Sequence, residues 1–262
     1  MEHVKKIHRI KKGYLVLIIV AVSIVTVLFA FAQFSSFGYR MTVPLRSFTE
    51  VSPNVYIHND FANNKADVVN LIEDAKSRVA DFFGELVSKP VIIICDDKKT
   101  IAKLGGDHDI TTTAIFKVYS YISLSSEFLN VDVIAHELTH AETHFRIYNG
   151  RIWSQGLVPV WFDEGVALQN DYREKYNETA WNDVPDGGNN VVALDDIDTA
   201  EEINVGKTEK TYEGEAAERR YRYIVSRYEV NRWIENNGLD ALLNLLDKVN
   251  QGENFNRSYF AE

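Results

Sequence analysis

The stretch from Val133 to His144 reads VIAHELTHAETH and places three histidines at intervals of four residues. His136 and His140 are one helical turn apart, so on a helix both imidazoles lie on the same face and reach one ion. Glu137 follows the first histidine and reaches a water on that ion. This His-Glu-x-x-His pattern, with two histidine ligands and a glutamate general base, predicts a zinc site with an open coordination position for catalysis.

The third histidine of the stretch is not expected to join this site. His144 lies eight residues after His136. On a helix that separation is about 12 Å along the axis, too far for one ion to be shared with both partners. We expect His144 to be a hydrogen-bonded or partly exposed histidine.

Two adjacent carboxylates in the segment WFDEGVA, residues 161–167, are candidates for a third ligand. HELTH followed by WFDEGVA resembles the gluzincin metallopeptidases, which are the thermolysin-like and aminopeptidase-like zincins. The resemblance is closest to small bacterial peptidase-MA-like domains, whose Pro-x-Trp lead-in matches Pro159 and Trp161. It implies Glu164 as the third zinc ligand, on a second helix. Asp163 is the alternative, which one helical position turns about 100° away.

The resemblance covers about residues 50–255 and departs from the family at one position. Thermolysin-like enzymes place an aspartate four residues after the ligand glutamate, where it orients a histidine ligand, but this chain has Leu168 there. Another carboxylate must then orient the imidazoles. Asp132, one turn before His136, and Asp171 are the candidates.

The resemblance also implies how such a site would hydrolyse a peptide bond. Zn²⁺ lowers the pKa of a water, and Glu137 takes its proton and later passes one to the leaving amine. The oxyanion forms against zinc and a tyrosine from a downstream helix, for which we choose Tyr223. The other tyrosines of that region, and the alternative that all of them only pack a helix face, stay open: Tyr212, Tyr221 and Tyr228.

Two segments are expected to shape the substrate cleft. Residues 116–124 are placed to form an edge strand to which an extended peptide adds itself, although an interior strand is the alternative. Residues 171–212 are acidic and polar and predict a long loop with little regular structure. This loop either covers the cleft and disfavours acidic substrates, or is solvated surface.

The remaining pattern predicts an α+β, zincin-like fold in which a small mixed sheet packs on the metal-binding helix. Helical spacing favours an amphipathic helix over residues 64–87 and two helices over 216–249, separated at Gly238. VYIH, VIIIC and residues 112–125 read as strands. The single cysteine, Cys95, lies in an apolar strand and is expected to be a buried, inert thiol.

The N-terminal segment has the pattern of a membrane anchor. Residues 1–12 are basic, and residues 14–34 are an uncharged apolar run that is long enough to cross a bilayer as a helix. By the positive-inside rule we expect a cytoplasmic tail over 1–12, a signal anchor over 13–34, a stem over 35–50 and an extracytoplasmic domain over 51–262. The small residues Ala30 and Ala32 keep a cleaved signal peptide, and hence secretion, as the alternative.

These patterns predict a membrane-anchored zinc metallopeptidase acting on peptides or proteins outside the cytoplasm. The net charge of −10 argues against nucleic acid as a partner. A catalytically inactive zincin-fold module for binding or assembly is the alternative function, against which the intact Glu137 argues. A hydrolase of another bond, such as a cell-wall crosslink, is a third reading. The sequence makes no prediction about the oligomeric state.

Overall fold

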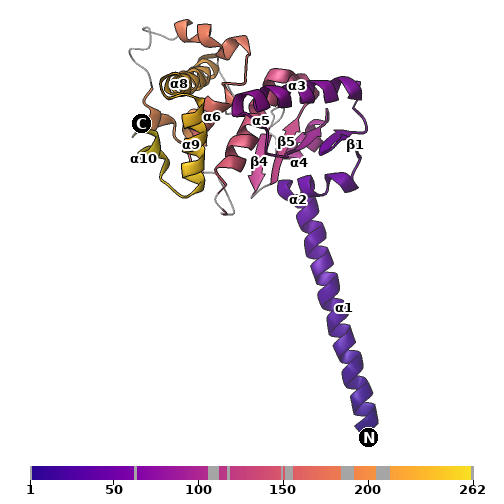
Figure 1. Cartoon of the computed structure of the whole chain (residues 1–262). Helices are drawn as coiled ribbons and strands as arrows, with labels where there is room; N and C mark the ends of the chain where they lie inside the picture. The colour runs from indigo at the N-terminus through magenta and orange to yellow at the C-terminus, as the bar shows by residue number, and fades with distance from the viewer. Residues whose placement is uncertain are drawn as a thin grey trace.

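The chain folds into a sheet covered by helices and followed by a mainly helical C-terminal part (Figure 1). The computed structural model describes residues 2–61, 64–105, 112–116, 119–148, 150, 156–183, 192–204 and 213–260. The expected α+β class is therefore confirmed. The zincin-like assignment within that class stays a prediction.

The sheet is small and mixed, as expected. Its strands are β1 (Phe48–Ser52), β2 (Val55–His58), β3 (Val91–Ile94), β4 (Thr112–Phe116) and β5 (Tyr119–Leu124), in the spatial order β1-β2-β3-β5-β4. The three central strands β2, β3 and β5 run parallel, and the outer strands β1 and β4 pair antiparallel with their neighbours. Most of the segment that we expected at the edge, residues 116–124, is therefore the interior strand β5. Among the described strands the edge on that side is β4.

Alternate side chains of β3 build two cores, one on each face of the sheet. Ile92 and Ile94 face helices α3 (Lys65–Phe83) and α5 (Val131–Arg146). Ile93 and Cys95 face the opposite core, together with residues of α2 (Ser36–Met41) and α4 (Lys98–Lys103). A strand buried on both faces needs apolar residues at every position, which explains the unbroken run VIIIC. Burial raises the pKa of the Cys95 thiol to about 12, so the thiol is inert as expected.

The segment that the sequence suggested as a stem, residues 35–50, packs onto this body. It contains α2, a short helical turn η1 (Val43–Leu45) and the start of β1. Tyr39, Val43 and Phe48 are buried against Ile93 and Ile101 of the second core. The packed body therefore begins near Ser36.

Helix α5 carries the histidine stretch and has clear start and stop signals. The side chain of Asn130 caps its first turn by accepting from the Val133 N–H at 3.0 Å. The helix lies between the sheet and α6 (Val160–Ala167), which begins directly after Pro159. Proline is tolerated at the start of a helix because the N–H groups there have no carbonyl partner within the helix, so the missing N–H of proline costs nothing. The two motifs are thus placed on neighbouring helices.

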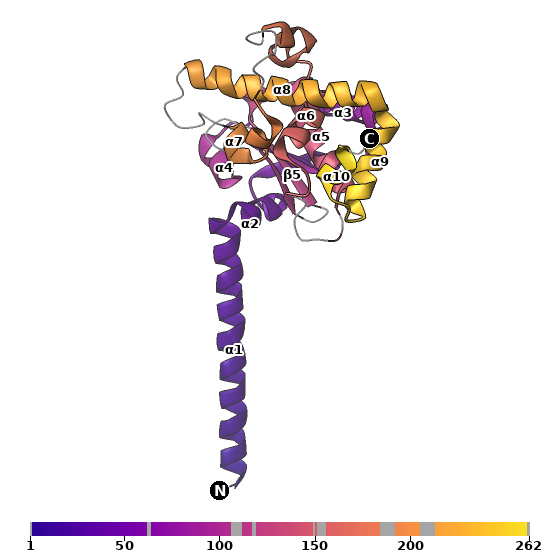
Figure 2. The same ribbon diagram turned by 90° about the vertical axis from the view of Figure 1, so that its left-hand side faces the viewer.

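The C-terminal helices lie over α6. Two long helices, α8 (Glu213–Asn237) and α9 (Leu239–Asn250), are separated at Gly238, whose φ of +88° favours glycine, and the prediction for residues 216–249 is confirmed. A short helix, α10 (Phe255–Tyr259), follows. Figure 2 shows α8 running across the molecule above α6 and α5. Between α6 and α8 the described part of the 171–212 loop forms only short turns, namely η3 (Glu174–Tyr176), η4 (Glu178–Asp183), η6 (Leu194–Ile197) and α7 (Ala200–Ile203).

The helix α1 (Glu2–Phe34) projects away from the body as a long rod in both views (Figures 1 and 2). Its described side chains are those of Tyr14 and residues 17–33, and the large apolar ones among them are exposed. Within the described residues, no helix combines the length and apolarity that crossing a membrane requires. The predicted membrane anchor over 13–34 therefore stays a prediction.

Candidate metal centre

Helices α5 and α6 bring three ligand atoms to one point. The Nε2 atoms of His136 and His140 lie 3.1 Å apart. Oε2 of Glu164 lies 3.3 Å from Nε2 of His136 and 3.5 Å from Nε2 of His140. Within the described residues these three form the cluster that is able to hold a metal ion, and both histidines and Glu164 are largely enclosed.

The size of this triangle fits a tetrahedral zinc site. Zinc lies about 2.0–2.1 Å from nitrogen and carboxylate oxygen, and a tetrahedron with those bonds has edges of about 3.3 Å. The three edges in this protein, 3.1, 3.3 and 3.5 Å, match that value. Moreover, Oε2 of Glu164 is buried and has no hydrogen-bond partner among the described residues, as expected for an atom that is reserved for a cation.

Each imidazole has a carboxylate behind its other nitrogen. Nδ1 of His140 lies 2.9 Å from Oδ2 of Asp163, and Nδ1 of His136 lies 3.4 Å from Oδ2 of Asp171. Neither contact has the alignment of a hydrogen bond in this geometry. The distances nevertheless suit carboxylates that hold the Nδ1 proton, which leaves both Nε2 lone pairs free for a metal.

The sequence predicted one of these two carboxylates and missed the other. Asp171 was a candidate; the other candidate, Asp132, pairs instead with Arg78 at 2.6 Å. Asp163 was expected to point away from the site. Its carboxylate instead reaches back to α5, where it contacts both His140 and His144, the latter at 3.1 Å. The i, i+4 spacing of those two histidines was the signal that a shared partner lies opposite them.

His144 stays outside the cluster, as predicted. It is buried, and its Nε2 faces Asp163 rather than Glu164. The three histidines of the stretch thus divide into two that point at the cluster and one that contacts an orienting carboxylate.

The charges at this site favour a cation. Burial raises the pKa of Glu164, but the imidazoles of His140 and His136 outweigh burial and lower the pKa to about 2. Burial also lowers the pKa of His136 and of His140, but for each the neighbouring carboxylates outweigh it and raise the pKa. The neighbouring carboxylates favour the protonated imidazoles, so a divalent cation bound here would replace protons.

Of the tyrosines considered for the oxyanion, Tyr223 reaches the cluster. Its hydroxyl donates to Oε1 of Glu164 at 3.2 Å. Tyr221 instead accepts from the Val192 N–H, and Tyr228 stacks on Trp181. Tyr212 lies outside the described residues. Burial and the charge of Glu164 raise the pKa of Tyr223 well above its usual value, so the phenol keeps its proton as a donor.

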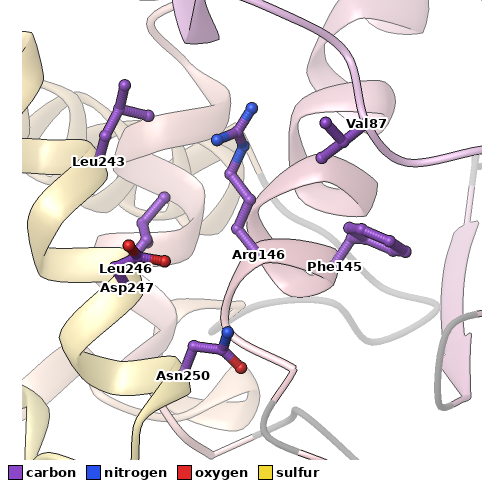
Figure 3. Close-up of a pocket in the computed structure, with 7 residues that line it drawn as sticks. All are labelled: Val87, Phe145, Arg146, Leu243, Leu246, Asp247 and Asn250. Carbon is purple, nitrogen blue, oxygen red and sulfur yellow. The ribbon is translucent and has the colours of Figure 1, made fainter.

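The predicted general base, Glu137, is buried on α5 next to His136. A separate pocket of about 200 Å³ opens at the far end of the same helix (Figure 3). It lies between the last turn of α5 and helix α9 and includes no residue of the metal cluster, so we assign it no part in the site. Its lining includes Phe145, Arg146, Leu243, Leu246, Asp247 and Asn250.

Comparison with known proteins does not place the chain in a family. No protein-family model matches the chain, and no curated protein is similar to it in sequence.

Proposed function

We propose that this protein is a zinc-dependent peptidase of the gluzincin type, with zinc held by His136, His140 and Glu164. The observation that carries the proposal is the triangle of two Nε2 atoms and one Oε2 atom, whose edges of 3.1, 3.3 and 3.5 Å fit tetrahedral zinc. The His-Glu-x-x-His pattern and the donor set of two imidazoles and one carboxylate support a catalytic site. Three protein ligands leave a fourth position open, whereas structural zinc sites are closed by four.

The remaining groups at the site have the chemistry that peptide hydrolysis requires. Bound zinc would supply a Lewis acid that polarises the peptide carbonyl and lowers the pKa of water toward neutrality. Glu137 takes the proton from the attacking water and passes a proton to the leaving amine. Tyr223 keeps its phenol proton, and its hydroxyl would exchange Glu164 as its acceptor for the oxygen on which negative charge develops.

We further propose that α1 anchors the peptidase to a membrane with its catalytic body outside the cytoplasm. Support comes from the basic residues 1–12, the uncharged apolar run that follows, and the exposure of the apolar side chains along α1. Exposed apolar side chains along a whole helix are unfavourable in water, because removing apolar surface from water is strongly stabilising.

The test of the peptidase compares metal content and cleavage in matched variants. We expect about one zinc per chain in the purified protein and cleavage of a mixed peptide library. Glu137→Gln should keep the zinc and lose cleavage by about 100-fold or more, since the general base is removed. Glu127→Gln, an exposed carboxylate just before α5, should change neither.

Two results would reject the proposal. One is equal cleavage by the wild type and the Glu137→Gln variant. The other is zinc binding without cleavage in either protein, which would instead favour an inactive module for binding or assembly.

A further inference from the structure

Four basic side chains gather beside the metal cluster, although the chain as a whole carries a net charge of −10. We call Arg173, Lys175, Arg219 and Arg220 the basic rim. Arg173 and Lys175 both lie over the ring of Tyr176, at 5.1 and 4.7 Å from its centroid. Arg220 donates from Nε to the backbone oxygen of Lys175 at 3.1 Å. The loop of residues 171–212 is acidic as a whole, but its first residues carry positive charge where they contact α8.

A pair of stacked tyrosines joins the basic rim to the metal cluster. Tyr176 and Tyr223 stack with ring centroids 5.8 Å apart, and Tyr223 contacts the ligand Glu164. Arg219 lies one turn before Tyr223 on α8, so both side chains share a helix face. One helical turn is about 5.4 Å, and an extended peptide advances about 3.3 Å per residue. Arg219 is thus within one or two substrate residues of a bond cleaved beside Tyr223.

Within the part of the chain that the structure describes, the basic rim is only partly neutralised by acidic side chains. Arg173 is held by both carboxylate oxygens of the buried Asp171. Among the described residues, by contrast, neither Arg219 nor the Lys175 ammonium forms an ion pair. Partial burial and the neighbouring Arg173 lower the pKa of Lys175, with Arg219 and Arg220 adding to the effect. Like charges held this close repel one another, and an anion bound between them relieves that repulsion.

We propose that the basic rim, chiefly Arg219 and Lys175, binds a carboxylate of the substrate beside the scissile bond. The enzyme then selects peptides that carry an acidic side chain, or a free C-terminal carboxylate, one or two residues from the cleaved bond. This inference rests on the proposed peptidase function and deepens it by naming the substrate class. Two cationic side chains suit a carboxylate because charge-assisted hydrogen bonds are the strong ones.

Binding is measured in the zinc-loaded, full-length Glu137→Gln protein, which is expected to hold peptides without cutting them. The probes are fluorescein-labelled, amidated hexapeptide mixtures of neutral residues, with Glu, Gln or Lys fixed at each position in turn. A further mixture of neutral residues has a free C-terminus, which separates the two sources of carboxylate. We expect at least one carboxylate mixture to bind about tenfold more tightly than its neutral counterpart by fluorescence anisotropy.

Substitutions in the rim should remove this preference. With Arg219→Gln and Lys175→Gln together, the carboxylate and neutral mixtures should bind within about twofold of each other, while zinc content and circular dichroism stay unchanged. The matched control is Arg232→Gln, an exposed arginine later on α8 that pairs with Glu229, and it should keep the preference.

The outcomes separate this inference from the peptidase proposal. Equal binding of all mixtures, no binding of any mixture, or a preference that survives both rim substitutions would overturn the inference. Wild-type cleavage of neutral peptides would still support the peptidase in those cases. Conversely, a rim-dependent carboxylate preference with no zinc-dependent cleavage would reject the peptidase and leave the carboxylate site standing.

Discussion

Asp163 and Asp171 each lie behind one imidazole of the metal cluster and are expected to set its orientation. We predict that Asp163→Asn and Asp171→Asn each weaken zinc binding by about 10- to 100-fold, because each loses the charge that holds the Nδ1 proton. Competition with a chromophoric chelator measures the affinity. Asp132→Asn is the matched control on α5, since Asp132 pairs with Arg78 rather than with an imidazole.

An unchanged zinc affinity in both variants would mean that the imidazoles are oriented by packing alone. A loss in Asp132→Asn as large as in the other two would point to a general loss of folding.

Zinc binding should release protons at neutral pH. Burial lowers the pKa of His136 and His140, but the carboxylates of Asp171, Asp163 and Glu164 outweigh it and raise both pKa values. A group with a raised pKa is protonated up to a higher pH, and zinc needs the neutral imidazole. Zinc affinity should therefore fall as the pH is lowered through these raised pKa values.

Calorimetry of zinc binding at pH 7, in buffers with different ionisation enthalpies, counts these protons. Asp171→Asn should release fewer protons than the wild type, because the pKa of its His136 is less raised. Binding without any proton release in the wild type would contradict the electrostatic account of the site.

At the scale of elements, the close approach of α6 and α8 positions Glu164, the proposed third ligand. Gly165 follows Glu164 directly, and a Cβ at this position would lie 2.4 Å from the Ser226 carbonyl oxygen and 2.5 Å from Cγ2 of Val230. Only glycine lets α8 pack this closely, and the same packing brings Tyr223 to Glu164. The Glu-Gly pair in the motif thus combines the proposed ligand with a contact site between two helices.

We predict that Gly165→Ala destabilises the protein by about 1–3 kcal/mol, because the added methyl overpacks the α6–α8 contact. Helix propensity alone predicts the opposite sign, with alanine favoured by about 1 kcal/mol. Urea unfolding decides between them. Ala241→Gly on α9 is the control and should follow propensity, with glycine less stable; a stabilising Gly165→Ala would refute the close-packing argument.

The sequence predicted which segments are helices and strands better than it predicted which of these elements lie next to one another. Helical spacing of apolar residues predicted α3, α5, α8 and α9, and an apolar run predicted β3. Both signals are local, so they can be recognised from the sequence. Strand order depends on which residues meet across the sheet, and nothing local distinguishes an interior β5 from an edge. Asp163 was missed for a similar reason, since the position of a carboxylate on an ideal helix does not say which partner on a facing helix attracts it.

At the scale of the molecule, α1 is the element that would attach the packed body to a membrane. We predict that the full-length chain fractionates with membranes and resists alkaline carbonate extraction, because the sequence of residues 14–34 is an uncharged apolar run, the pattern on which the proposed anchor rests. The chain that starts at Ser36 should be soluble and bind zinc with the same affinity, since α2 and β1 complete the packed body. Release of the full-length chain by carbonate would contradict the anchor, and an N-terminus starting after Ala32 would establish signal-peptide cleavage.

The metal cluster also lies between two helices. The two imidazoles belong to α5 and the carboxylate belongs to α6. An ion at this point is a removable crosslink, and its binding energy adds to the folded state only. Bound zinc would then slow proteolysis of the protein, and a chelator would lower the stability of the fold as well as remove the metal from the proposed catalytic centre.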